Sequence, residues 1–289
     1  KNVCRPQRLA LNNRQSTGPV TMPRFSANLS MLFGEVAPID RIEAAARAGF
    51  DGVEIQFPYD IPVEDLAKAC QRARLPLVLI NIPAGDFAKG DRGLGALPGR
   101  EAEFRAAVDR ARTYAAALQV GRVNLLAGVP GPDADPARCR ATLVDNIRYA
   151  ARILGDIGVT VCIEAINSRD VPGFFVNDPD QAISILDEAG VPNTALQYDL
   201  YHMQIMRGDL IPTLTRLKHR IGHIQFADTP GRHEPGTGEI NFENVFEALD
   251  RIGYDGWVGA EYVPRTTTSE SLGWLEAWRD RAVRTKLAG

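Results

Sequence analysis

Val161-Cys162-Ile163-Glu164 decides the fold, because this short apolar run ends in a carboxylate and precedes a helical pattern. Three later stretches repeat the arrangement: Ala195-Leu196-Gln197-Tyr198-Asp199, His223-Ile224-Gln225 and Trp257-Val258-Gly259-Ala260-Glu261. Alternation of apolar runs with helical segments is typical of βα units in a parallel sheet. Since the strands of such units end at one edge, we expect Glu164, Asp199, Gln225 and Glu261 to lie at one face.

The same alternation occurs eight times after Met22. The predicted strands are residues 25–32, 52–57, 76–83, 122–128, 160–167, 194–202, 222–228 and 256–264. Eight units in roughly 265 residues match the usual size of a (β/α)8 barrel, or TIM barrel. No Pro/Gly/Ser-rich linker divides the chain, so residues 22–289 are predicted to form a single α/β barrel domain.

Local signals mark several helices and one long loop. Val245, Leu249 and Ile252 form one apolar stripe and predict a helix over 244–252. Asp178 followed by Pro179 predicts a helix start, and glycines predict helix ends at positions 49, 158, 190 and 253. The glycine-rich stretch 84–98 follows the third predicted strand, so we expect it to form a lid over the mouth of the barrel rather than a plain loop.

The N-terminal 21 residues differ from the rest of the chain. They contain Lys1, Arg5, Arg8 and Arg14, no acidic residue and no apolar periodicity. We expect residues 1–21 to be an extension outside the barrel, whether a transit peptide, a leader or another upstream segment. Met22, just before the first predicted strand, is the expected functional start.

Bulk properties exclude several classes of protein. The 289 residues have a formal net charge of -3, which offers no broad basic surface and disfavours a nucleic-acid partner. No apolar stretch approaches the roughly 20 residues of a membrane span, so we expect no membrane partner. The four cysteines form no Cys-x-x-Cys pair, and reduced thiols in a cytoplasmic protein fit best. A small-molecule substrate is expected, and the sequence leaves the oligomeric state open, a homo-oligomer included.

The four strand-end side chains predict a divalent-metal site. A single carboxylate there would more often pair with a loop arginine, but like charges gathered in one mouth repel each other unless a cation neutralises them. The oxygen donors of Glu164, Asp199, Gln225 and Glu261 are hard ligands, which favour Mg²⁺ or Mn²⁺ over zinc. Such an ion would leave positions open for the adjacent oxygens of an α-hydroxycarbonyl substrate.

This arrangement suits a proton shift between adjacent carbons through a cis-enediol. Glu164 and Glu261 come from the fifth and eighth strands and could flank the substrate on opposite sides, so we expect them to be the catalytic acid–base pair. His202 could bind a substrate oxygen, or it could be a packed core histidine. Arg232 could clamp an anionic substrate, or it could form a surface ion pair. For His223 a structural role is favoured over a ligand role.

Several motifs resemble one known family, the hydroxypyruvate isomerases of the xylose-isomerase-like barrel superfamily. The motifs are FSANLSMLFGE at 25–35, LPGRE at 97–101, QYDLYHMQ at 197–204, EPGTGEIN at 234–241 and GWVGAEY at 256–262. The resemblance implies isomerisation of hydroxypyruvate to tartronate semialdehyde, with Glu164 and Glu261 at the family's catalytic positions. Related ketose epimerases place metal ligands at the positions of Glu164, Asp199 and Glu261, and usually a histidine where Gln225 stands.

Other functions stay open from the sequence alone. The nearest alternative is a 2-oxo-tetronate isomerase, followed by a ketose 3-epimerase or a metal-dependent dehydratase with the same ligands. An endonuclease of this architecture would need a histidine-rich zinc centre and a basic surface, whereas the chain has four histidines and a net negative charge. A scaffold without catalysis would have no use for the repulsion between Glu164 and Glu261.

Overall fold

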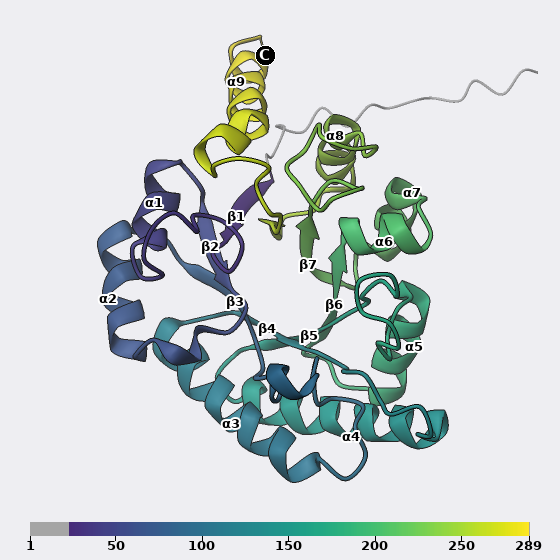
Figure 1. The fold of residues 1–289 in the computed structure, drawn as a ribbon. Coiled ribbons are helices and arrows are strands. Elements are labelled where there is room, and N and C mark those ends of the chain that lie inside the picture. The colour runs from purple at the N-terminus through teal and green to yellow at the C-terminus, as the bar shows by residue number, and fades with distance from the viewer. Residues whose placement is uncertain (1–22, 289) are drawn as a thin grey trace, which may run out of the picture.

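Eight parallel strands close into a barrel in the computed structural model, which describes residues 23–288, with side chains described to residue 281 (Figure 1). The strands are β1 (Arg24–Asn28), β2 (Gly52–Ile55), β3 (Leu77–Asn81), β4 (Arg122–Leu125), β5 (Thr160–Glu164), β6 (Thr194–Asp199), β7 (Ile221–Phe226) and β8 (Trp257–Ala260). Each strand pairs with its sequence neighbours, and β1 pairs with β8. The predicted TIM barrel is confirmed.

Helices form the outer layer around the strands (Figure 1). They are α1 (Arg41–Arg47), α2 (Val63–Ala73), α3 (Glu101–Leu118), α4 (Pro136–Gly155), α5 (Pro179–Ala189), α6 (Leu200–Met206), α7 (Leu210–Leu217), α8 (Phe242–Ile252) and α9 (Gly273–Ala288). Short 3-10 helices are η1 (Pro58–Asp60), η2 (Phe87–Lys89) and η3 (Ser269–Leu272). None of the helices in the described residues 23–288 is long and apolar enough to cross a bilayer.

The predicted start of α5 and the helix ends predicted at Gly190 and Gly253 agree with the capping geometry, whereas α1 and α4 end before Gly49 and Gly158. Asp178 Oδ1 accepts hydrogen bonds from the backbone N–H groups of Asp180 and Gln181 at 2.9 and 3.1 Å, and Pro179 opens α5. The predicted sixth strand, 194–202, is too long at its end. Asp199 accepts a hydrogen bond from the Tyr201 backbone N–H at 2.7 Å and so caps α6, which turns residues 200–202 into helix.

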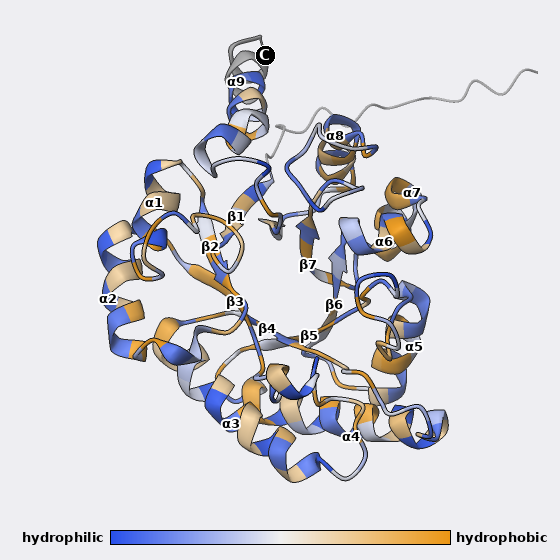
Figure 2. Cartoon of the chain, in the orientation of Figure 1, coloured by the Kyte–Doolittle hydropathy of each residue, from blue (hydrophilic) through white to orange (hydrophobic). Residues whose placement is uncertain are grey.

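Apolar packing lies between the strands and the helices, while the middle of the barrel is polar. Figure 2 shows hydrophobic residues along the strands and mixed faces on the surrounding helices. Phe25 of β1 packs edge-to-face on Phe246 of α8 and on Trp274 of α9, each with ring centroids 5.1 Å apart. Inside the barrel, Glu54 and His223 are completely buried. A polar interior of this kind places charge directly beneath the C-terminal ends of the strands.

The loop after β3 is anchored along half of its length. Gly95 and Ala96 donate backbone hydrogen bonds to the carbonyls of Leu126 and Ala127 at 3.1 and 2.7 Å. The expectation that residues 84–98 form a lid stays a prediction. The predicted extension 1–21 and the predicted start Met22 lie outside the described residues.

Candidate active site

The four predicted strand-end residues lie at the C-terminal edge of the barrel. Glu164 ends β5, Asp199 ends β6, Gln225 lies near the end of β7, and Glu261 follows β8. Their exposed fractions are 6%, 1%, 1% and 4%, respectively. Buried carboxylates are costly unless they are paired or bind an ion, so this edge is where the molecule holds unusual charge.

The buried carboxylates perturb one another. Burial, with the charges of Glu261 and Asp199, raises the pKa of Glu164 well above its ordinary value. Burial also raises the pKa of Asp199 and of Glu261, although Arg232 opposes both shifts. Ionising all three acids together is therefore unfavourable without further positive charge, and perturbation of this kind is common at functional sites.

Glu261 has one oxygen held by amides and one oxygen facing a cation. Its Oε1 accepts hydrogen bonds from Asn28 Nδ2 at 2.9 Å and from Gln56 Nε2 at 2.7 Å, with Gln225 Nε2 at 3.3 Å. Its Oε2 accepts from Arg232 Nη2 at 2.7 Å. The carboxylate is thus fixed in position through Oε1, and Oε2 is held by Arg232.

Glu164 shows the same division of roles between its two oxygens. Asn124 Nδ2 donates to Glu164 Oε2 at 2.9 Å. The nearest cation-capable group to Oε1 is His202 Nε2, which lies 3.7 Å away. Oε2 is thus fixed by an amide, and Oε1 lies on the side of His202.

Gln225 turns its amide nitrogen toward the neighbouring carboxylates. Nε2 donates to Glu54 Oε2 at 2.8 Å, while Oε1 accepts from Gln197 Nε2 at 2.6 Å. The reverse orientation would place an amide oxygen against Glu54 and Glu261, so this orientation is the chemically favourable one. A ligand role for Gln225 therefore requires the side chain to turn, and it stays a prediction.

The predicted substrate-binding residues both lie at this edge. His202 is buried, 3.6 Å from Asp199 Oδ2, and burial followed by the charge of Arg232 lowers its pKa to about 3. Arg232 Nη2 lies 3.8 Å from Asp199 Oδ2 in addition to its contact with Glu261, and its guanidinium stacks over the Tyr201 ring at 5.0 Å. Burial opposes the charge on Arg232, but Glu261 and Asp199 outweigh it, so the pKa of Arg232 is raised.

The loop that carries Arg232 is organised by one buried carboxylate. Asp228 accepts hydrogen bonds from the backbone N–H groups of Thr229, Gly236, Gly238 and Ile240 at 2.8 to 3.1 Å. These donors fold the EPGTG segment, residues 234–238, back onto Asp228. Arg232 takes a left-handed φ of 57° within the loop, and its carbonyl accepts from the Val263 N–H at 2.9 Å.

Sequence reasoning missed the polar layer below the carboxylates. Glu54 Oε1 lies 2.9 Å from His223 Nε2 and accepts from Ser26 Oγ at 2.5 Å. The favoured structural role of His223 agrees with this placement. Polar residues at a spacing of two in the first two strands, Ser26 with Asn28 and Glu54 with Gln56, are the signal that could have revealed inward-facing polar side chains.

A divalent cation fits the donor set. A group of three side chains, Glu164, Asp199 and His202, places its ligand atoms within 4.8 Å of one another. Asp199 Oδ2 is buried without a hydrogen-bond partner, an uncommon state for a carboxylate oxygen. Three buried acids with raised pKa values supply, when ionised, negative charge that a hard cation would neutralise.

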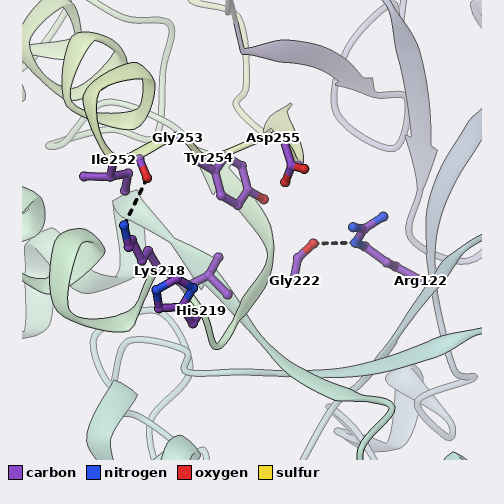
Figure 3. A pocket seen from close by; sticks show the side chains of 10 residues that line it. Arg122, Lys218, His219, Gly222, Ile252, Gly253, Tyr254 and Asp255 are labelled. Atoms are coloured by element: carbon purple, nitrogen blue, oxygen red, sulfur yellow. Dashed lines mark hydrogen bonds between the residues drawn. The ribbon is translucent and has the colours of Figure 1, made fainter. Parts of the chain in front are cut away.

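A cavity of about 150 Å³ lies at the other end of the barrel, where the strands begin (Figure 3). There Arg122 Nε donates to the Gly222 carbonyl, and Lys218 Nζ donates to the Ile252 carbonyl at 3.4 Å. None of the predicted site residues lines this cavity. Since these cations contact backbone carbonyls, their role at this end is structural.

Fold and site together define a class of protein. A family model described as xylose isomerase-like TIM barrel matches residues 42–278, and the chain belongs to this family. The chain is 48% identical over 260 residues to the 2-oxo-tetronate isomerase of Cupriavidus necator, covering 90% of this chain and 100% of that protein. It is 47% identical over 258 residues to the hydroxypyruvate isomerase of Escherichia coli, covering 89% of this chain and 100% of that protein.

Solved structures agree with the fold. A crystal structure titled AP endonuclease, family 2, from Brucella melitensis is 43% identical, with a TM-score of 0.87, over 89% of this chain and 99% of that chain. The 3-keto-D-glucoside 4-epimerase YcjR from E. coli has a TM-score of 0.73 at 20% identity, over 88% of this chain and 99% of that chain. The second similarity concerns the fold alone.

Proposed function

We propose that this enzyme is an isomerase that converts hydroxypyruvate to tartronate semialdehyde. The observation that carries the proposal is the pair of buried glutamates, Glu164 and Glu261, each with one oxygen held by an amide and the other beside a cation-capable side chain, His202 or Arg232. Two opposed carboxylates of this kind can remove a proton from one carbon and return a proton to its neighbour. The names of the relatives from E. coli and C. necator support an isomerase.

The reaction needs no oxidant or reductant. One glutamate takes a proton from C3 of hydroxypyruvate, and the electrons of that C–H bond form the C2–C3 double bond of a cis-enediol as the C2 oxygen gains a proton. The other glutamate then delivers a proton to C2, and the C3 oxygen loses its proton as the aldehyde forms. The raised pKa values of Glu164 and Glu261 suit this work, because a carboxyl with a raised pKa is both a better base and an available acid.

The other polar side chains would orient the substrate. Arg232 can exchange its contact with Glu261 for the substrate carboxylate, which frees Glu261 Oε2 for proton transfer. His202 lies beside the other glutamate, Glu164, where it can donate a hydrogen bond to a substrate oxygen. Burial of Glu164, His202 and Glu261 keeps water away from the proton path.

Mg²⁺ or Mn²⁺ is the proposed cofactor. Glu164, Asp199 and Glu261 would hold it, with Gln225 as the predicted fourth ligand. When bound, such an ion would polarise the substrate carbonyl and its neighbouring hydroxyl. The described free thiols of Cys70, Cys139 and Cys162 fit the proposed cytoplasmic location.

A second candidate substrate is a 2-oxo-tetronate, because the C. necator relative with that name is as similar as the E. coli hydroxypyruvate isomerase. The test is to incubate metal-free and metal-loaded protein with hydroxypyruvate and with 2-oxo-tetronates and to compare kcat/KM. The proposal expects metal-dependent turnover with the higher kcat/KM for hydroxypyruvate. Higher kcat/KM for the four-carbon acid would establish the second candidate, and turnover of neither would reject both.

Cleavage of DNA is not supported, although the similar Brucella structure carries an endonuclease title. The chain has a net charge of -3, and phosphate binding requires positive charge. The group of possible metal-binding side chains in the described part of the chain contains one histidine, His202, which differs from a histidine-rich multi-zinc centre. A non-catalytic role as a binding module is also disfavoured, because such a module would have no use for the buried acids.

A further inference from the structure

Asn167, in the loop between β5 and α5, has its amide orientation fixed by the backbone. The residue is completely buried, with an exposed fraction of 0%. Its Oδ1 accepts hydrogen bonds from the backbone N–H groups of Arg169 and Asp170 at 3.0 and 2.8 Å. Because backbone N–H groups can only donate, the oxygen of Asn167 must face them and the amide nitrogen must face the other way.

The amide nitrogen of Asn167 faces two acceptors. Nδ2 donates to Asp170 Oδ2 at 3.0 Å and lies 2.7 Å from His202 Nδ1. An amide nitrogen has two protons and no lone pair to offer, so the second proton points at His202 Nδ1. That ring nitrogen must therefore be the unprotonated one. A neutral imidazole then carries its single proton on Nε2.

The protonated nitrogen of His202 faces the reaction space. Nε2 lies 3.7 Å from Glu164 Oε1 and 3.6 Å from Asp199 Oδ2, and both distances are too long for a good hydrogen bond. The N–H group thus has no close acceptor among the side chains beside it. A substrate oxygen between these carboxylates would provide one.

We propose that Asn167 is a positioning residue that fixes His202 as the Nε2–H tautomer, so that His202 donates a hydrogen bond to a substrate oxygen and does not bind the metal ion. Ligation through Nε2 would need its lone pair, and the proton would have to move to Nδ1, opposite the donor Nδ2 of Asn167. Of the three side chains that group together, Glu164 and Asp199 are then ligand candidates and His202 is not. The substrate role rests on the proposed function, whereas the tautomer does not.

The same loop also supports the proposed carboxylate clamp. Asp170 Oδ2 accepts from Tyr201 Oη at 2.9 Å as well as from Asn167, and Tyr201 carries the guanidinium of Arg232 on its ring. One short segment therefore orders two substrate-binding candidates on adjacent elements. Ser168 offers a matched control in this segment, because its side chain is exposed and donates a weak hydrogen bond to Met206 Sδ, at 3.6 Å.

The test is a ¹H–¹⁵N correlation spectrum of the full-length protein labelled with ¹⁵N-histidine, which distinguishes the two tautomers by their ring couplings. The chain has four histidines, and His202→Gln identifies the signal of His202. The wild type and Ser168→Ala should show His202 protonated on Nε2 only. Asn167→Asp replaces the amide donor that faces His202 Nδ1 with a carboxylate oxygen, which can only accept. His202 Nδ1 should then carry a proton.

Activity gives an independent readout of the same idea. Asn167→Asp should lower kcat for hydroxypyruvate by about 10-fold to 100-fold, the usual range for a group that orients an active-site residue, while Ser168→Ala stays near the wild type. A wild-type spectrum with the proton on Nδ1, or an Asn167→Asp spectrum identical to the wild type, would overturn the proposal. Because the tautomer is measured without substrate, a protein with the expected spectrum and no isomerase activity would reject the proposed function and leave the tautomer assignment intact.

Discussion

Polar side chains at the two ends of the barrel differ in how they are paired. At the end where the strands begin, Arg24 donates to the Asp255 carbonyl at 2.6 Å and Lys218 donates to the Ile252 carbonyl. At the end where the strands finish, Glu164, Asp199 and Glu261 are buried beside one another, and Asp199 Oδ2 has no hydrogen-bond partner. Satisfied polar groups stabilise a fold, whereas buried like charges persist at a cost in stability that only a ligand relieves. The contrast locates function at one end.

Replacing the catalytic candidates should give the largest effect. Glu164→Gln and Glu261→Gln should each lower kcat for hydroxypyruvate by more than about 100-fold, because an amide cannot accept the proton. Far-UV circular dichroism should remain that of the wild type.

The matched control lies at the other end of the barrel. Lys218→Gln removes a charge that donates to the Ile252 carbonyl, far from the carboxylates, and should leave kcat within about 2-fold of the wild type. Substantial turnover in either glutamate variant, or an equal loss in Lys218→Gln, would remove the distinction between the two ends.

The layer between the two ends depends on one glycine. A Cβ atom at Gly259 would lie 1.9 Å from Glu54 Oε1, so Gly259→Ala should destabilise the fold by about 1–3 kcal/mol, as overpacking does. Urea unfolding measures this change. Gly273→Ala serves as the control, because nothing lies within 4 Å of its Cβ position. A neutral Gly259→Ala would mean that Glu54 does not fill the barrel interior tightly.

A comparison of charged with uncharged substrates tests whether Arg232 binds the substrate carboxylate. Arg232→Lys keeps a cation but loses the planar fork, so the KM for hydroxypyruvate should rise by about 10-fold. The KM for dihydroxyacetone or glycolaldehyde should change much less, because these hydroxycarbonyls carry no carboxylate. Steady-state kinetics with both kinds of substrate decides the matter. Equal increases for charged and uncharged substrates would give Arg232 a structural role instead.

The pH dependence of the free energy of unfolding should reveal the buried acids at the mouth, and its measurement does not depend on activity. Since burial and the neighbouring acids raise the pKa of Glu164 above 4.5, the folded state favours the protonated acid. Its stabilising contribution is present below that pH and is lost as pH rises through the folded-state pKa. In chelator, the free energy of unfolding should therefore fall as the pH rises above about 4.5, by at most about 1.4 kcal/mol per pH unit for one carboxyl.

Two changes to that pH titration, one in the protein and one in the solution, identify the groups responsible for the slope. Glu164→Gln should flatten the slope, because the amide does not ionise, and added Mg²⁺ or Mn²⁺ should flatten the slope in the wild type by stabilising the ionised acids. A slope unchanged in Glu164→Gln would assign the pH dependence to other groups.

Local patterns predict the strands, but they do not predict the partners inside the barrel. The apolar runs that end at Glu164 and Glu261 are visible over a few residues, so their strands and shared edge could be predicted. Glu54 and His223 meet across 169 positions of sequence, and a single carboxylate in the second strand carries no linear sign of that contact. Asp228 likewise fixes the loop of Arg232 through backbone N–H groups that only the folded chain brings together.

Exchange of the C3 hydrogens of hydroxypyruvate with D₂O, followed by ¹H NMR beside product formation, tests the two-glutamate site most directly. The wild type should produce tartronate semialdehyde. Neither Glu164→Gln nor Glu261→Gln should form product, yet one of the two should still exchange the C3 hydrogens above the rate without enzyme, because the remaining glutamate can remove that proton and return a deuteron. The other variant should exchange none. Isomerisation that survives in both variants, or C3 exchange that is retained equally in both, would contradict the assignment of one glutamate to each carbon.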